Sequence, residues 1–265
     1  MPTDTPIPDP PNPDPRGSAR QDPAPQRPAL PAAVLWDMDG TLVDTEPHWI
    51  AAEHALMARH GASWSHEQAL QLVGSALPDS GRLLAAHLAA EAGVHLDPDA
   101  IVAELIGEVV HQVSASVVWR PGALQLLREL GALGVPCALV TMSYRSLAGT
   151  VAALVPGAFT VVVAGDEVAR GKPAPDPYLR AAHLLGVDPA RCVVLEDSAP
   201  GVASGEAAGA RVIACPHMVP IPPAPGRSRV ASLAELDAAA LGRVAAGHVV
   251  DSLADSPATR PARGA

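Results

Sequence analysis

The chain has 265 residues, 48% of them hydrophobic, and a formal net charge of −10 from 18 basic and 28 acidic residues. This length allows about one to two domains with a buried core. The acidic balance, without any basic cluster, argues against a nucleic-acid or membrane-surface protein. No apolar run approaches the roughly 20 residues of a membrane span, and the start of the chain lacks the apolar region of a secretory signal peptide. Three scattered cysteines without metal-binding spacing indicate reduced thiols, and we expect a cytoplasmic protein.

Two features of the composition bear on function. Residues 1–31 are rich in proline and contain no aromatic residue, so we expect a disordered leader there. Lys172 is the only lysine, and every other basic residue is arginine. A coding bias explains the arginines, and it makes the one retained ammonium group a candidate functional residue.

Five short runs are apolar almost throughout, which is typical of strands buried on both faces. They are residues 32–38, 136–142, 159–165, 191–197 and 211–215. Between these runs lie four helical patterns. They are residues 121–133, 143–154 with Ser143 as a possible cap, 176–186 and 198–209. Strands that alternate with helices predict an α/β fold with a doubly wound parallel sheet, resembling a Rossmann core.

The gap between the first two predicted strands is too long for one crossover and contains helical segments without a convincing strand. These segments are residues 46–60, 65–73, 79–92 and 98–117. We expect residues 46–117 to form a helical cap over the end of the first strand, and residues 32–45 and 118–244 to form the core. From residue 245 to 265 the sequence thins into Ala, Pro and Arg, so we expect a frayed tail.

Polar residues stand where four of the predicted strands end. They are Asp37, Asp39 and Thr41, with Gly40 among them, where the first strand ends; Thr141, followed by Ser143, where the second ends; Lys172 after the third; and Glu196 and Asp197 at the end of the fourth. Because ligands bind outside the carboxyl ends of parallel strands, we expect these residues to share one rim of the sheet.

Carboxylates, a hydroxyl and an ammonium group at one rim suit phosphoryl transfer. Asp37 can attack phosphorus, and with Asp197 and the backbone carbonyl of Asp39 it can hold Mg²⁺. Lys172 and the Thr141 hydroxyl can hold the phosphoryl oxygens. Asp39 can protonate the leaving group and then activate water. Gly40 allows the sharp turn that a close approach to phosphate requires.

In this order, DMDGT (residues 37–41), Thr141, GKP (171–173) and EDS (196–198) resemble the four motifs of the haloacid dehalogenase superfamily across nearly all of residues 32–215. DTEP after DMDGTLV resembles its cap-containing branch of phosphatases and β-phosphoglucomutases. The resemblance implies a Mg²⁺-dependent phosphomonoester hydrolase that acts on a small phosphorylated metabolite through an aspartyl-phosphate at Asp37. It implies that Asp39 is the acid and base, and that Asp197, assisted by Glu196, holds Mg²⁺.

The predicted phosphate-binding residues are Gly40, Thr41, Met142, Ser143 and Lys172. Met142 departs from the family pattern, because relatives often carry a small or amide residue there. We therefore expect its backbone N–H, not its side chain, to contact phosphate.

Two other functions remain open from the sequence. A phosphomutase of the β-phosphoglucomutase type would use the same Asp37 and return the phosphoryl group to the substrate. A non-catalytic phospho-acceptor would keep it. Dehalogenase chemistry is disfavoured because it does not need the second aspartate of the first motif, which this chain has as Asp39. Phosphonate cleavage is excluded because it needs a lysine in the cap, and residues 46–117 contain none. The expected partner is a small phosphate ester, with no nucleic acid or membrane.

Other conspicuous residues are expected to be structural. Asp44 and Glu46 resemble charges at a helix N-terminus, and a lone His48 near it is more often exposed or structural. The tryptophans at 49, 64 and 119 are expected to pack the insert and its linkers. The remaining candidates, His54, His60, His87, His111, Arg145 and Arg170, are expected on the surface.

Overall fold

The computed structural model describes residues 30–254, and a six-stranded sheet lies at its centre. The strand order is β3-β2-β1-β4-β5-β6, and all neighbouring strands are parallel. The strands are β1 (Ala33–Trp36), β2 (Cys137–Val140), β3 (Val161–Val163), β4 (Cys192–Glu196), β5 (Arg211–Ala214) and β6 (Ser228–Arg229). The predicted doubly wound α/β fold is therefore confirmed. The two polar residues of β6 form no apolar run, which is why the sequence did not predict this strand.

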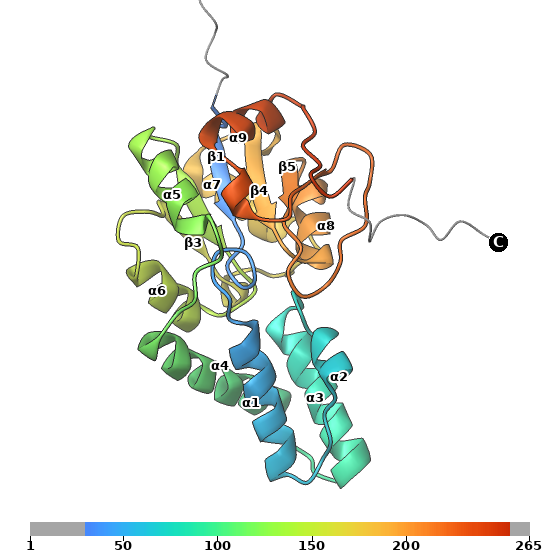
Figure 1. Cartoon of the computed structure of the whole chain (residues 1–265). Coiled ribbons are helices and arrows are strands. Elements are labelled where there is room, and N and C mark those ends of the chain that lie inside the picture. The colour runs from blue at the N-terminus through green and yellow to red at the C-terminus, as the bar shows by residue number, and fades with distance from the viewer. Residues whose placement is uncertain (1–29, 255–265) are drawn as a thin grey trace, which may run out of the picture.

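Helices flank the sheet on both faces (Figure 1). One face carries α5 (Ala123–Ala132), α6 (Arg145–Ala153) and α9 (Ala238–Ala245), and the other carries α7 (Asp176–Leu185) and α8 (Ala199–Ala207). The sheet has one apolar cluster on each face. Successive β1 residues point to opposite faces, so Val34 and Trp36 belong to the cluster on the α5, α6 and α9 side, while Ala33 and Leu35 belong to the cluster on the α7 and α8 side. Burial on both faces explains the continuous apolar runs.

The predicted insert forms four helices that lie together beyond one end of the sheet (Figure 1). They are α1 (Glu46–Arg59), α2 (His66–Leu70), α3 (Leu77–Ala92) and α4 (Pro98–Ala115). A capping box between Ser65 and Gln68 begins α2, as the Ser-x-x-Gln pattern predicts. Gly93 adopts a left-handed conformation (φ +67°) after α3 and ends it.

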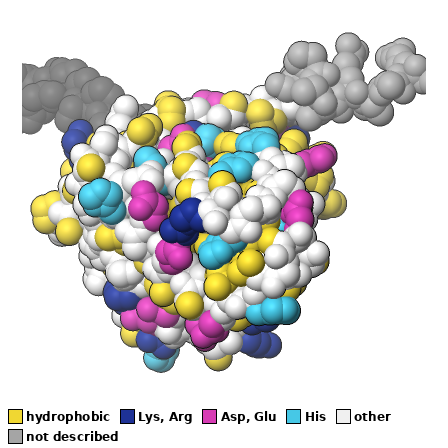
Figure 2. Space-filling model, turned by 90° about the horizontal axis from the view of Figure 1, so that it is seen from below, with side chains coloured by type: hydrophobic (Ala, Val, Ile, Leu, Met, Phe, Trp, Pro, Cys, Tyr) yellow, Lys and Arg dark blue, Asp and Glu magenta, His cyan; other side chains and the backbone are white. Residues whose placement is uncertain are grey.

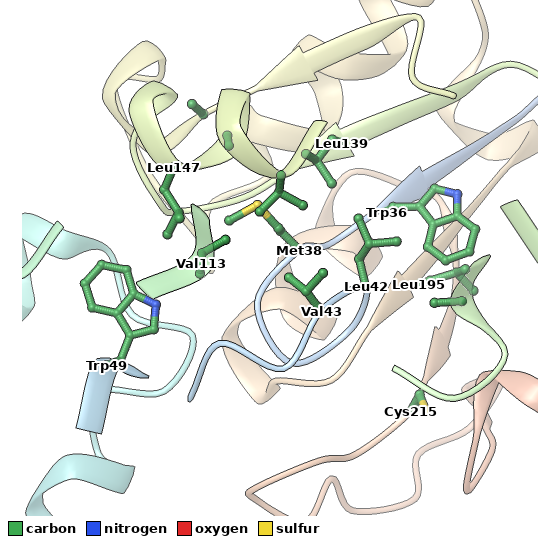
Figure 3. Packing of buried hydrophobic residues seen from close by; sticks show 14 of the residues in the cluster. Trp36, Met38, Leu42, Val43, Trp49, Val113, Leu139, Leu147, Leu195 and Cys215 are labelled. Carbon is green, nitrogen blue, oxygen red and sulfur yellow. The ribbon is translucent and has the colours of Figure 1, made fainter. Parts of the chain in front are cut away.

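One apolar cluster runs from the sheet into the insert without a break. Figure 3 shows Trp49 of α1 and Val113 of α4 beside Leu147 of α6, with Met38 and Leu42 of the turn after β1 nearby. All five side chains are buried. The helical insert is therefore packed onto the core in this structure, over the end of the sheet where β1 finishes.

The chain after α9 is held against β6. The backbone N–H of Arg229 donates to the Val250 carbonyl at 2.7 Å, and the Arg229 guanidinium lies 2.9 Å from an Asp251 carboxylate oxygen. The backbone N–H of Ser252 returns a hydrogen bond to Arg229 at 3.0 Å. The expectation of a frayed tail from residue 245 is therefore wrong as far as Ser252, because an ion pair and backbone hydrogen bonds fix this segment. The rest of the predicted tail, 255–265, and the predicted leader up to residue 29 lie outside the described residues.

The outer face of the insert carries a mixed surface. Figure 2 shows acidic, basic and histidine side chains interspersed with apolar ones, and no single-sign patch gathers on this face. Within residues 30–254, no helix combines the length and the apolar character needed to cross a membrane.

Candidate active site

Asp37 stands directly after β1, at the point where the strand order reverses between β2 and β4. Such a switch point is where open parallel sheets bind ligands. Its backbone N–H donates to the Leu195 carbonyl at 3.0 Å, which continues the ladder with β4. Gly40 then turns the chain with a φ of +81°, and a Cβ there would lie 2.1 Å from Asp197 Oδ2. Only glycine therefore allows this turn to pack against Asp197.

Lys172 connects the first and fourth predicted motifs. Its Nζ lies 2.6 Å from Asp37 Oδ1 and 2.6 Å from Glu196 Oε1, and it donates to the Val140 carbonyl at 3.1 Å. The Lys172 side chain is buried. All three protons of the ammonium group are thus used within the protein, so this lysine fixes the orientation of Asp37.

Glu196 is fully buried and has both carboxylate oxygens occupied. Besides Lys172, Oε1 accepts a hydrogen bond from the Tyr178 hydroxyl at 2.7 Å. Oε2 accepts from the backbone N–H groups of Asp197 and Ser198 at 3.1 and 3.2 Å. A Cβ at Gly201 would lie 1.8 Å from Glu196 Oε1, so the first turn of α8 must be free of a side chain there. Glu196 therefore positions Lys172 and the start of α8.

Two carboxylate oxygens at this rim have no partner. Asp37 Oδ2 and Asp197 Oδ2 are buried and make no hydrogen bond within the described residues. Ligand oxygens of Asp37, Glu196 and Asp197 all lie within 4.8 Å of one another. Hard divalent cations prefer such oxygen ligands, and an unpaired buried carboxylate is costly without one. These residues fit a divalent metal ion, with Asp37 and Asp197 offering the free oxygens.

The crowding of negative charge is visible in the pKa values. Burial, followed by the Glu196 carboxylate, raises the pKa of Asp37 to about 7 even though Lys172 acts to lower it. Burial and the Asp37 carboxylate raise the pKa of Asp197 well above its ordinary value. Burial acts to lower the pKa of Lys172, but the carboxylates of Asp37 and Glu196 outweigh it and raise this pKa. One ammonium does not neutralise three carboxylates, whereas the ammonium together with a divalent cation would.

The carboxylate of Asp39 is held by side-chain donors from the end of β2 and from the start of α1. Its Oδ2 accepts hydrogen bonds from the Thr141 and Ser143 hydroxyls at 2.9 and 2.8 Å. Its Oδ1 accepts from the Thr45 hydroxyl at 2.5 Å and lies 3.4 Å from Trp49 Nε1. Both oxygens of the Asp39 carboxylate are thus occupied by hydrogen bonds within the protein.

The structure corrects one local expectation and adds detail to two others. Ser143 does not cap α6, because the helix begins at Arg145 with Tyr144 at its N-cap, and the Ser143 hydroxyl is directed to Asp39 instead. The Thr41 hydroxyl donates to Asp197 Oδ1 at 3.3 Å. The Met142 sulfur accepts the backbone N–H of Lys172 at 3.1 Å, so this unusual residue supports the loop that carries the lysine.

A cavity leads from these residues into the insert. It is lined on the core side by Asp37, Asp39, Thr141, Met142, Ser143, Lys172, Asp197 and Ser198. On the insert side α1 contributes Glu46, Trp49, Ile50 and Glu53, and further residues come from α2, α3, α4 and the loop after α2. A Cβ at Gly74 in that loop would lie 2.7 Å from the Ser198 side chain, so the loop touches the core rim.

The sequence did not predict that α1 faces the site. Glu46 is the first residue of α1, as expected of a helix N-terminal charge, but it is also buried and lines the cavity. Trp49 packs in the apolar cluster as expected, and in addition its Nε1 contacts Asp39. The spacing of residues 46, 49, 50 and 53 places them on one helix face, and this periodicity could have revealed the set.

The other sequence candidates do not line this cavity and have partners elsewhere. Asp44 pairs with His217, His48 contacts Gln112, Arg145 pairs with Glu167, and Arg170 pairs with Asp176. Trp64 donates to Glu53 Oε2 at 2.9 Å and packs edge-on against His87.

Comparison with known proteins places this site in context. The family model of haloacid dehalogenase-like hydrolases matches residues 31–209. The chain is 35% identical over 195 residues to the bifunctional riboflavin kinase/FMN phosphatase of Arabidopsis thaliana. That match covers 71% of this chain and 49% of the relative, so the chain spans about half of that protein's length. It is also 36% identical over 185 residues to hexitol phosphatase A of Escherichia coli, covering 68% of this chain and 81% of the relative.

Solved structures share the fold. CbbY from Rhodobacter sphaeroides, in complex with phosphate, superposes with a TM-score of 0.71 at 28% identity, covering 78% of this chain and 96% of that one. A variant of the same protein has been solved with xylulose-(1,5)bisphosphate.

Proposed function

The chain belongs to the haloacid dehalogenase-like hydrolase family, and we propose that it is a metal-dependent phosphatase that hydrolyses the phosphate monoester of a small metabolite. The observation that carries this proposal is the pair of buried, unpartnered oxygens on Asp37 and Asp197 beside the Lys172 ammonium. The phosphatase names of relatives such as hexitol phosphatase A support it.

Asp37 is the proposed nucleophile. One carboxylate oxygen attacks phosphorus, a new P–O bond forms to Asp37, and the bond between phosphorus and the ester oxygen breaks. Lys172 holds Oδ1 at 2.6 Å and limits the charge repulsion between the carboxylate and the incoming phosphate. The Tyr178 and backbone donors on Glu196 keep Lys172 in place.

Asp39 is the proposed acid and base. Protonated Asp39 gives its proton to the departing alkoxide and, as a carboxylate, then removes a proton from the water that attacks the aspartyl-phosphate. This second attack breaks the bond between Asp37 and phosphorus and releases inorganic phosphate. Its hydrogen bonds from Thr45, which precedes α1, and from Trp49 of α1 orient it for this task.

Thr141, Ser143 and the backbone N–H of Met142 are the proposed phosphate ligands. In the present structure the two hydroxyls donate to Asp39, so they must exchange this carboxylate for phosphoryl oxygens when substrate binds. Gly40 and Thr41 shape the opposite side of the site, where the Thr41 hydroxyl steadies Asp197.

We propose Mg²⁺ as the metal, held by the free oxygens of Asp37 and Asp197 and by the Asp39 backbone carbonyl. When bound, it neutralises the phosphate charge that would otherwise repel the Asp37 carboxylate. Glu196, expected from the sequence as a further ligand, acts through Lys172 in this proposal because its oxygens already accept hydrogen bonds.

Helices α1 to α4 are proposed to act as a cap that excludes water and contacts the leaving group. The contact between Gly74 and Ser198 and the shared apolar cluster correspond to a closed arrangement of this cap. The proposed compartment is the cytoplasm, whose reducing conditions suit three buried free thiols.

The test is phosphate release from a panel of sugar, polyol and nucleotide monophosphates, with Mg²⁺ and with EDTA. We expect metal-dependent turnover that falls by about a thousandfold or more in Asp37→Asn. Turnover that survives in this variant, or that is unchanged by EDTA, would overturn the proposed mechanism. Stable phosphorylation of Asp37 without turnover would indicate a phospho-acceptor instead.

A further inference from the structure

The cavity as a whole has an unusual charge balance. Cavity-lining residues include five carboxylates, those of Asp37, Asp39, Asp197, Glu46 and Glu53, and Lys172 is the one cation among the described residues that line it. Since Lys172 donates all its protons to the protein, no cation is available where the leaving group would lie.

Glu46 is the residue in this wall that most clearly lacks a partner. It is only 6% exposed and lines the cavity, and its carboxyl group makes no hydrogen bond within residues 30–254. The Glu46 carboxyl group therefore opens on the cavity without a hydrogen-bond partner from the protein, and its polar atoms are available to a ligand. A ligand that supplies hydrogen-bond partners would explain it.

Glu53 lies two helical turns further along the same face of α1 and is 5% exposed. The Trp64 indole donates to its Oε2, which fixes the side chain, and no described residue donates to its Oε1. Burial raises the pKa of Glu46 to about 8 and that of Glu53 to about 7. Near neutral pH such carboxyl groups can both accept and donate hydrogen bonds, as hydroxyl groups of a ligand require.

The remainder of this wall is compatible with an uncharged ligand. Ser75 and Ser80 line the cavity together with the apolar residues Trp49, Ile50, Leu72, Leu77, Val102 and Leu105. Convergent polar groups on an apolar surface are typical of small-molecule sites. A second phosphate or a carboxylate placed here would meet Glu46 and Glu53 with no counter-charge.

We propose that Glu46 and Glu53 are specificity residues that select an uncharged, polyhydroxylated leaving group and reject a leaving group that carries a second anionic group. This inference rests on the proposed function and names the substrate class for the same site: monophosphates of sugars or polyols. It also disfavours the phosphomutase alternative, since a mutase of that type must hold a bisphosphate in this cavity.

The experiment compares two substrates with the same carbon chain, sorbitol 6-phosphate and 6-phosphogluconate, in the presence of Mg²⁺. We expect kcat/KM for sorbitol 6-phosphate to exceed that for 6-phosphogluconate by about tenfold or more. Measured at about pH 9, above the pKa of both carboxyl groups, this ratio should fall in Glu46→Gln and further in Glu46→Gln/Glu53→Gln, because the amide removes the negative charge and keeps the shape. Glu67→Gln, which removes an exposed charge on α2 outside the cavity, should leave the ratio unchanged.

A measurement on the unaltered enzyme protects the inference from a variant that fails to fold. Sorbitol should inhibit hydrolysis more strongly than gluconate. Equal or preferential hydrolysis of 6-phosphogluconate would overturn the inference alone, with the phosphatase function intact, and so would an unchanged ratio in folded Glu46→Gln. Absence of metal-dependent phosphate release from every ester would overturn the proposed function and the inference with it.

Discussion

Gly40 and Asp197 are in such close contact that a methyl group on Gly40 would overlap the carboxylate: its Cβ would lie 2.1 Å from Asp197 Oδ2. Gly40 also has a φ of +81°, which disfavours other residues. Asp197 is 2% exposed and offers the free oxygen assigned to the metal, so the glycine determines where that oxygen lies.

We therefore predict that Gly40→Ala lowers phosphatase activity by about a hundredfold or more, since small displacements of catalytic groups have effects of this size. Gly61→Ala is the matched control, because Gly61 has a similar φ of +74° and no atom within 4 Å of the added Cβ. Gly61→Ala should lose about 1 kcal/mol of the free energy of unfolding from its positive φ alone, and Gly40→Ala should lose more because its added methyl group also overlaps Asp197. Thermal unfolding and initial-rate measurements separate the two effects, and equal activity in both variants would contradict the prediction.

The buried lysine provides a second test. Lys172→Met removes the ammonium that lies 2.6 Å from both Asp37 Oδ1 and Glu196 Oε1. It leaves two buried carboxylates without a counter-charge, so the free energy of unfolding at pH 8 in EDTA should fall by about 3–5 kcal/mol. Adding Glu196→Gln should recover part of this loss without recovering activity, because the amide removes one of the two charges. A Lys172→Met protein as stable as wild type in urea unfolding would show that the ammonium does not offset these charges.

Lys172→Arg tests the shape of the cation separately. The charge is retained, but a planar guanidinium cannot direct three donors to Asp37, Val140 and Glu196 as the compact ammonium does. We expect most of the phosphatase activity to be lost. Near-normal rates in Lys172→Arg would show that phosphatase activity does not depend on the shape of the ammonium group.

We expect a bound metal ion to offset the repulsion between the buried carboxylates of Asp37 and Asp197, which destabilises the folded protein. Burial and the Asp37 carboxylate both disfavour ionised Asp197, whose Oδ2 has no partner. Asp197→Asn should therefore raise the thermal unfolding midpoint in EDTA, by about 2–4 °C for each kcal/mol of repulsion removed. Mg²⁺ should raise the midpoint of the wild-type protein by mass action and that of the variant far less. Calorimetry with and without Mg²⁺ gives both comparisons, and an equal response to Mg²⁺ would remove Asp197 from the metal site.

Some of this site follows from the sequence because parallel strands end at one edge. The positions of Asp37, Thr141, Lys172 and Asp197 could be predicted since each follows or ends a recognisable apolar run, and the sheet then brings them together. This reasoning needs only a parallel sheet, and the alternation of strands with helices along the sequence predicts one.

Contacts that depend on how helices are rotated could not be predicted in the same way. That the Tyr178 hydroxyl reaches Glu196 depends on the packing of α7 against the sheet. The proximity of Trp49 to Asp39 and the exposure of Glu46 and Glu53 to the cavity depend on the angle at which α1 leaves the core. A helix N-terminal acid and a buried tryptophan have ordinary structural explanations in a sequence, and only the packing of the insert gives them a further role.

The last prediction concerns Glu53 and the pH dependence of stability. Burial raises the pKa of Glu53 from an ordinary value of 4.5 to about 7. The folded state therefore binds this proton more tightly than the unfolded state, and the contribution of Glu53 to stability declines as the pH rises from about 4.5 to about 7. Glu53→Gln carries no such charge, and its amide oxygen can still accept from Trp64. From about pH 5 to pH 8, the free energy of unfolding of the variant should therefore rise relative to that of wild type by on the order of 1–3 kcal/mol. Urea unfolding across this range checks the sign, with the exposed Glu67→Gln as the control expected to track wild type. A difference between Glu53→Gln and wild type that stays constant with pH would mean that Glu53 is ionised in the folded protein throughout this range.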